Sequence, residues 1–85
     1  MLTDTKVRQA KAREKPYKLA DEGGLYLYVS PAGAKSWRYD YRLHGKRETL
    51  TLGRYPDVPL AGEDGARGRH REARKHVEKA RALPG

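Results

Sequence analysis

The chain has 85 residues, no cysteine and a net charge of +8, from 19 lysines and arginines against 11 acidic residues. This length suits one small domain, and the lack of cysteine excludes a disulfide framework and a thiolate metal site. No apolar run reaches the length of a signal sequence or a membrane span, so we expect a cytoplasmic protein or part of one, and the positive charge indicates a polyanionic partner, nucleic acid before anionic membrane.

The first expected element is a short helix over residues 3–12. Thr3 is suited to cap its N-terminus, and Asp4 lies in the first turn, where the helix dipole favours an acidic side chain. Pro16 prevents the helix from continuing, because the residue before a proline avoids helical geometry. A helix this short is stable only when it packs against another element.

A sheet is expected next, because three segments have the alternation of strands: residues 25–29, 37–43 and 47–53. Residues 17–21 could form a short additional strand. Two prolines within residues 54–59 predict that the chain leaves the sheet there. The predicted fold class is α+β: a three-stranded antiparallel sheet, with or without the extra strand, packed against a short N-terminal helix and a C-terminal helix.

The remaining sequence predicts a helix, because residues at four-three-four-three spacing form one helical face: Ala66, His70, Ala73, Val77 and Ala80. Glycines at 62, 65 and 68 lower helix propensity. The helix is therefore predicted over residues 69–81, and its start before that is left open. Its other sides are rich in arginine and lysine, which fits contacts to phosphate and fits equally a solvent-exposed surface paired with glutamates.

Alternation also assigns the two faces of the sheet, because successive side chains of a strand point to opposite sides. The expected core side chains are Leu25, Leu27, Val29, Trp37, Tyr39, Leu50 and Leu52. A two-residue turn at 44–45 pairs Trp37 with Leu52 and Tyr39 with Leu50, whereas a turn one residue later shifts each pairing by two residues. Both turns keep the same residues inside, and a three-residue loop would turn them outward.

The opposite face of the sheet is expected to carry polar and aromatic side chains: Tyr26, Tyr28, Arg38, Asp40, Arg42, Arg47, Thr49 and Thr51. A solvated sheet surface explains arginines and threonines, but it does not explain two exposed tyrosines. With the turn at 44–45, Arg42 would also lie directly opposite Arg47, a pair that an anion would stabilise. Arginine can bind guanine, threonine a base edge and tyrosine a phosphate in the major groove. We therefore predict that this face reads double-stranded DNA.

The sequence offers no catalytic or metal-binding constellation. His70 and His76 are six residues apart, so they do not share a helix face as paired metal ligands do. His44 is a turn residue without a partner for general-base chemistry. We therefore predict no enzyme activity, no catalytic residue, no metal and no cofactor.

Five stretches, in this order, resemble the N-terminal arm-binding domain of prophage and genomic-island integrases, which are tyrosine recombinases: LTDTKVRQAK, KPYKLADEGGLYLYV, PAGAKSWRYDYR, GKRETLTLGRYPDVPLA and ARGRHREAR. The resemblance covers residues 1–61 closely and residues 66–82 more loosely. It implies a small sheet, backed by helices, that binds arm-type attachment-site DNA in the major groove. The residues that it places on the DNA-binding face are Tyr26, Tyr28, Arg38, Asp40, Arg42, Thr49 and Thr51. The catalytic residues of such recombinases lie in a separate C-terminal domain, so the chain is expected to bind DNA without cutting it.

The resemblance makes residues 1–83 one arm-binding domain and residues 84–85 a tail toward the core-binding and catalytic parts of a longer integrase. Its expected partners are double-stranded DNA and the rest of the integrase, at the nucleoid of the bacterial cytoplasm. Residues 62–65, GEDG, interrupt the family's usual passage into the last helix. Two other functions fit the composition: a double-stranded-RNA-binding or toxin-like RNA module with a catalytic His44, and a protein-interaction domain that uses the exposed tyrosines.

Overall fold

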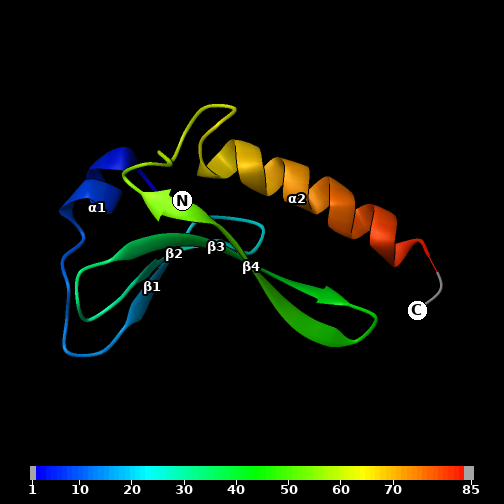
Figure 1. The fold of residues 1–85 in the computed structure, drawn as a ribbon, viewed down its shortest axis with the longest axis horizontal. Helices are drawn as coiled ribbons and strands as arrows, with labels where there is room; N and C mark the ends of the chain where they lie inside the picture. Colours follow the sequence, from blue (N-terminus) through cyan, green and yellow to red (C-terminus); the bar gives the residue numbers. More distant parts are fainter. Residues whose placement is uncertain (1, 84–85) are drawn as a thin grey trace.

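The computed structural model describes residues 2–83, and the predicted tail at residues 84–85 lies outside them. Its elements are α1 (Asp4–Gln9), β1 (Tyr17–Ala20), β2 (Leu25–Val29), β3 (Lys35–Leu43), β4 (Lys46–Tyr55) and α2 (Ala66–Arg81). The strands form one antiparallel sheet in the order β1-β2-β3-β4 (Figure 1). The α+β class is confirmed, and the possible extra strand is formed, because β1 pairs with β2 along its whole length and gives the sheet four strands.

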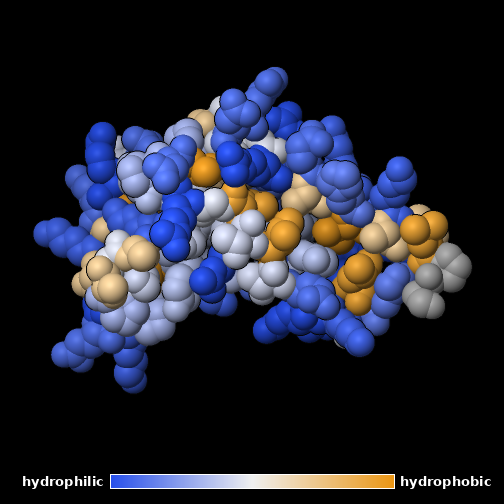
Figure 2. All heavy atoms as spheres, viewed as in Figure 1, coloured by the Kyte–Doolittle hydropathy of each residue, from blue (hydrophilic) through white to orange (hydrophobic). Residues whose placement is uncertain are grey.

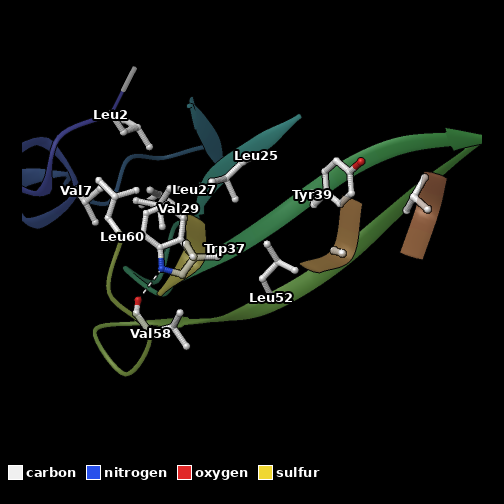
Figure 3. Packing of buried hydrophobic residues seen from close by; sticks show 13 residues of the cluster. Leu2, Val7, Leu25, Leu27, Val29, Trp37, Tyr39, Leu52, Val58 and Leu60 are labelled. Carbon is white, nitrogen blue, oxygen red and sulfur yellow. Dashed lines mark hydrogen bonds between the residues drawn. The ribbon is translucent and has the colours of Figure 1, made fainter. Parts of the chain in front are cut away.

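Both helices pack on the same face of the sheet, where the hydrophobic core lies. Val7 of α1 and Val77 of α2 are buried in one cluster with the inward side chains of the strands (Figure 3). Trp37 is fully buried there, and its indole Nε1 donates a hydrogen bond to the carbonyl of Val58 at 2.7 Å. The predicted facing of the sheet is confirmed by six buried residues: Leu25, Leu27, Val29, Trp37, Tyr39 and Leu52.

Leu50 differs from the other predicted core residues, because 41% of its surface is exposed. It lies in an open groove between the end of the β3–β4 hairpin and the C-terminal half of α2, with neighbours that include Tyr41, Leu43 and Val77. Figure 2 shows hydrophobic side chains gathered over this half of α2. Alternation places Leu50 on the face that α2 covers, but the open groove separates α2 from the hairpin at this point, so the prediction that Leu50 is buried is wrong.

α1 begins as predicted, with the hydroxyl of Thr3 capping its N-terminus, but it ends at Gln9 rather than at residue 12. The ammonium of Lys35 in β3 donates to the carbonyl of Val7 at 2.9 Å and to the following carbonyl at 3.2 Å. These are carbonyls that a further helical turn would have bound. A side chain from the sheet therefore replaces the end of the predicted helix.

The β3–β4 hairpin turns at His44 and Gly45, the first of the two predicted turns. Both residues have positive φ, 50° and 81°, which is the geometry of a tight turn whose twist matches that of the strands. Tyr39 faces Leu50, as this turn requires.

A β-bulge opposite the Trp37–Arg38 step changes the pairing farther along the hairpin. Trp37 faces Gly53 rather than the predicted Leu52, because Leu52 is an extra residue on β4. Arg69 of α2 supports the bulge, since its Nη1 donates to the carbonyl of Leu52 at 2.9 Å. Gly53 has a φ of +143°, which residues with a side chain rarely adopt. The bulge is thus fixed by a tertiary contact and by a glycine.

β4 continues to Tyr55, two residues beyond its predicted end. Arg54 faces Ser36 and Tyr55 faces Lys35 in the ladder. The prediction that the chain leaves the sheet at residue 54 is therefore wrong. Pro56 is the first residue here that lacks an amide hydrogen, and it comes just after the last pair.

α2 begins at Ala66, three residues before the predicted start. Its first two amides donate to the carbonyls of Pro59 at 2.7 Å and Leu60 at 3.0 Å. Gly68 is buried within the helix against the carbonyl of Glu63, where a β-carbon would collide. Gly65 and Gly68 are therefore points where the preceding loop packs closely on the helix, whereas Gly62 has open space around it.

A buried carboxylate, Asp21, joins three parts of the fold. Its side chain is 1% exposed, and the guanidinium of Arg67 in α2 donates to both of its oxygens at 3.1 and 3.2 Å. The amide of Leu2 donates to the same carboxylate at 2.9 Å, and Arg67 donates to the carbonyl of Leu2 at 2.9 Å. The residues before α1, the end of β1 and the start of α2 are thus held by one network.

This network makes stability depend on acid. Burial favours protonated Asp21, but the hydrogen bonds from Arg67 and Leu2 and the charge of Arg67 outweigh burial and hold the Asp21 pKa below its ordinary value of 3.8. A lowered folded-state pKa stabilises the fold while the carboxylate is charged. We expect this contribution to be complete above the unfolded-state pKa and to be lost as pH falls through the folded-state pKa. Urea unfolding from about pH 6 to about pH 2 measures the stabilisation from charged Asp21. A free energy of unfolding that stays unchanged to the lowest pH would contradict this expectation.

Candidate nucleic-acid interface

The sheet face opposite the two helices, the open face, consists of four rows of facing side chains. The rows are Lys18, Tyr28, Ser36 and Arg54; Ala20, Tyr26, Arg38 and Thr51; Asp40 and Thr49; and Arg42 and Arg47. All eight residues predicted for this face lie on it. The structure adds Lys18, Ala20, Ser36 and Arg54.

The sequence prediction omits two cations of the open face, Lys18 and Arg54. If residues 17–20 are treated as a full strand, their alternation places Lys18 on the open face. Arg54 reaches the open face only because of the extra residue at Leu52. A glycine inside a strand, here Gly53, is the weak sequence signal for such a bulge.

Both tyrosines of the open face support cations. The guanidinium of Arg38 lies over the ring of Tyr28, with its carbon 4.0 Å from the ring centroid. The ammonium of Lys18 lies over the ring of Tyr26 at 4.7 Å. Such contacts attract the cation electrostatically and restrict its side chain. The open face therefore presents cations that are already oriented.

The prediction that both tyrosines of this face are exposed is wrong for Tyr26, because only 7% of its surface is exposed. Tyr26 is part of the support rather than the outermost layer. Its hydroxyl donates to Oδ1 of Asp40 at 3.1 Å. Burial and this hydrogen bond raise the pKa of Tyr26 above its ordinary value, so the phenol stays protonated. Tyr26 thus fixes the position of Asp40.

Asp40 lies among the cations and is held by three neighbours. Its Oδ1 accepts from the hydroxyls of Tyr26 and Thr49, the latter at 2.8 Å. Its Oδ2 is 3.9 Å from the ammonium of Lys18, an ion pair longer than a hydrogen bond. Asp40 has 32% of its side chain exposed, so the carboxylate is fixed but reachable.

The end of the hairpin is strongly cationic. Arg42 faces Arg47 directly, as the predicted turn at residues 44–45 requires. Arg81, in the last turn of α2, donates from Nε to the carbonyl of Arg42 at 2.9 Å. These three arginines, with Lys18 and Asp40, line one polar hollow. The end of α2 therefore adds positive charge beside the open face.

His70 and His44 occupy structural positions, whereas His76 is exposed on α2. His70 is buried, its Nε2 lies 3.0 Å from the carbonyl of Gly23, and its ring meets Tyr39 edge-on. His44 is in the hairpin turn. Within residues 2–83, no three acidic or histidine side chains are placed to share a metal ion. Neither helix in this range has the length and apolar character needed to span a bilayer.

Residues 2–82 match the family model of the arm DNA-binding domain. The chain belongs to this family. The integrase of Shigella phage Sf6 and the prophage integrase IntS of Escherichia coli K12 are each 48% identical to this arm domain over 60 residues, covering 71% of the chain and 16% of each relative. The integrase of Enterobacteria phage P4 is 45% identical over 76 residues, covering 87% of the chain and 17% of the relative.

The match bears on the extent of the arm DNA-binding domain. It includes both helices, and it runs through the GEDG segment into α2. The arm domain spans only 16–17% of the length of the relatives named above.

Proposed function

We propose that this arm domain binds double-stranded DNA through its open face, as the arm-site-binding part of a site-specific integrase acting on the bacterial nucleoid. The observation that carries the proposal is the charge of the open face in a member of the arm DNA-binding domain family. The strand residues of that face include five cations, Lys18, Arg38, Arg42, Arg47 and Arg54, against the carboxylate of Asp40. Cations gathered on one face supply the sequence-independent affinity for phosphates.

The long β3–β4 hairpin is the part of the sheet best shaped for the major groove. It extends beyond the shorter strands β1 and β2 (Figure 1). The B-form groove is about 12 Å wide and admits a two-stranded ribbon, whose strands are about 4.8 Å apart. In this arrangement Arg38, Asp40 and Thr49 face base edges, and Arg42 and Arg47 approach the phosphates that would relieve their mutual repulsion.

Arg38→Ala and Arg42→Ala are expected each to weaken specific DNA binding by about 1–3 kcal/mol with little effect on folding. Arg38→Ala removes an oriented base-edge donor, so it should also relax base preference at one position. Arg42→Ala removes a phosphate contact, so it should weaken binding to all duplexes and lower the salt slope by about one. Fluorescence anisotropy with a selected duplex and a scrambled duplex, over a series of salt concentrations, measures both effects.

Arg71→Ala is the matched control. It removes the same charge from α2, at a place where Glu63 and Asp64 of the preceding loop lie nearby. It should leave base preference unchanged and affect affinity least. If Arg38→Ala and Arg42→Ala bind as tightly as the wild type while remaining folded, the open face is not the DNA-binding surface.

Duplex RNA distinguishes this proposal from an RNA-binding function. The A-form major groove is deep and narrow, so a β-ribbon cannot enter it. The arm domain is therefore expected to prefer duplex DNA to duplex RNA of the same sequence at matched salt. Equal or tighter binding to RNA would contradict the proposal, and failure to bind either nucleic acid at low salt would favour a protein-interaction domain.

A further inference from the structure

A surface that only attracts phosphate does not need the carboxylate of Asp40. Asp40 lies in the middle of the open face, on β3 between Arg38 and Arg42. A carboxylate there repels the DNA backbone and lowers affinity for every duplex. Its neighbours Tyr26 and Thr49 do not require the charge, because a neutral amide oxygen could accept their hydroxyl hydrogens equally well. The charge itself therefore needs another explanation.

The two oxygens of Asp40 have different surroundings. Oδ1 accepts two hydrogen bonds, from the hydroxyls of Tyr26 and Thr49. Oδ2 accepts none within residues 2–83, since its nearest cation, the ammonium of Lys18, is 3.9 Å away. A carboxylate oxygen has acceptor capacity for about two hydrogen bonds. Oδ2 is therefore a fixed acceptor with unused capacity, beside a fixed donor.

We propose that the Lys18–Asp40 pair recognises a C·G base pair in the major groove. In this contact Oδ2 of Asp40 accepts from the N4 amino group of cytosine, and Nζ of Lys18 donates to O6 or N7 of the partner guanine. The inference rests on the proposed function, and it makes Asp40 a specificity-determining residue of the open face.

The spacing of the pair supports this assignment. Cytosine N4 and guanine O6 are joined by a base-pair hydrogen bond and are therefore about 3 Å apart. The acceptor Oδ2 and the donor Nζ, 3.9 Å apart, match that donor and acceptor. Lys18 has 59% of its side chain exposed and rests on the ring of Tyr26, so it can adjust by the small remaining difference.

Cytosine fits the carboxylate better than the other bases do. Thymine presents the acceptor O4, and guanine presents O6 and N7, so each repels a carboxylate. An A·T pair offers an amino donor beside the O4 acceptor of thymine, so it is the nearest competitor. It is disfavoured because adenine N7 places an acceptor next to the carboxylate, and because Lys18 meets the thymine methyl group where guanine has a second acceptor, N7. Asp40 thus gives specificity partly by rejecting the wrong bases, at the cost of a lower affinity for all DNA.

Selection from a randomised duplex library, with the 85-residue chain and its variants, tests the inference. The wild type is expected to select a motif with one C·G position, where replacement by T·A or G·C weakens binding about tenfold. Asp40→Asn keeps an acceptor for Tyr26 and Thr49 but places an amide donor at the Oδ2 position. It should lose the preference at that one position, retain the rest of the motif, and bind scrambled duplex about twofold more tightly.

Two further variants make the test sharp. Lys18→Met removes the donor at an exposed position and should weaken the preference at the same base pair. Asp57→Asn, the same chemical change in the exposed turn after β4, should leave the motif unchanged. Circular dichroism verifies that each variant is folded.

The outcomes separate this inference from the proposed function. If folded Asp40→Asn selects the wild-type motif, the inference is overturned. It is also overturned if Asp40→Asn loses the whole motif, because Asp40 then only organises the open face. In either case the proposed function stands as long as Arg38→Ala and Arg42→Ala weaken binding. If those two variants bind like the wild type, the proposed function fails first.

Discussion

Replacing Asp21 by alanine is expected to lower the free energy of unfolding by about 3 kcal/mol. The variant leaves Arg67 and the amide of Leu2 without their shared acceptor at a site where the carboxylate is almost completely buried. Arg67 itself is 37% exposed and can be partly rehydrated, so the loss falls at the lower end of the range for buried ion pairs. Urea unfolding followed by tryptophan fluorescence measures the change, because Trp37 lies in the core.

Asp4→Ala is the control for this prediction. Asp4 forms an ion pair with Arg8 at 4.0 Å, in which both side chains are more than 60% exposed. Its removal should cost less than about 1 kcal/mol. The Asp21 variant should also lose much of the decline in stability that the wild type shows below the ordinary aspartate pKa. Equal losses in the two variants would show that the Asp21–Arg67 network does not hold the fold together.

Gly53→Ala is expected to cost about 3 kcal/mol of unfolding free energy, the second of the two largest effects. The φ of +143° at Gly53 disfavours any side chain, and a β-carbon there would lie 2.5 Å from Cγ2 of Val58. Val58 can move only with difficulty, because its carbonyl accepts the indole hydrogen of Trp37. The substitution should therefore disturb the core as well as the bulge, and thermal unfolding measures the loss.

Gly45→Ala separates the two causes of that loss. Gly45 has a φ of +81°, but a β-carbon there would meet nothing within 4 Å. Its replacement should therefore show the backbone penalty alone, about 1 kcal/mol. A Gly53→Ala variant no less stable than Gly45→Ala would mean that Val58 yields to the new methyl group without cost.

The parts of the fold that sequence predicts well are those set by local periodicity. The alternation of residues 37–43 places Trp37 and Tyr39 inside and Arg38 and Asp40 outside, whatever the rest of the chain does. The turn residues His44 and Gly45 then fix the register at the hairpin end. The eight predicted residues of the open face follow from these two local rules. Their role in DNA binding remains a prediction for the variants above.

The parts that sequence does not predict depend on contacts between distant segments. The bulge at Leu52 is supported by Arg69 from α2, and the end of α1 is set by Lys35 from β3. Likewise, the start of α2 depends on the carbonyls of the loop before it. The exposure of Leu50 reflects the open groove between α2 and the hairpin. None of these contacts between distant segments can be read from a local sequence pattern.

The bulge also has an evolutionary consequence for the hairpin. It separates the hairpin into an outer part, residues 38–51, and a root that is anchored through Trp37, Gly53 and the loop at Val58. Arg38, Asp40 and Thr49 point outward from the outer part, whereas the tight packing lies at the root and around the inward-facing Tyr39. If the open face reads DNA as proposed, substitutions on the outward side of the outer part change which sequence is bound, while the root and the inward side preserve stability. A domain divided in this way could then acquire new target sites without having to recover its fold at each step.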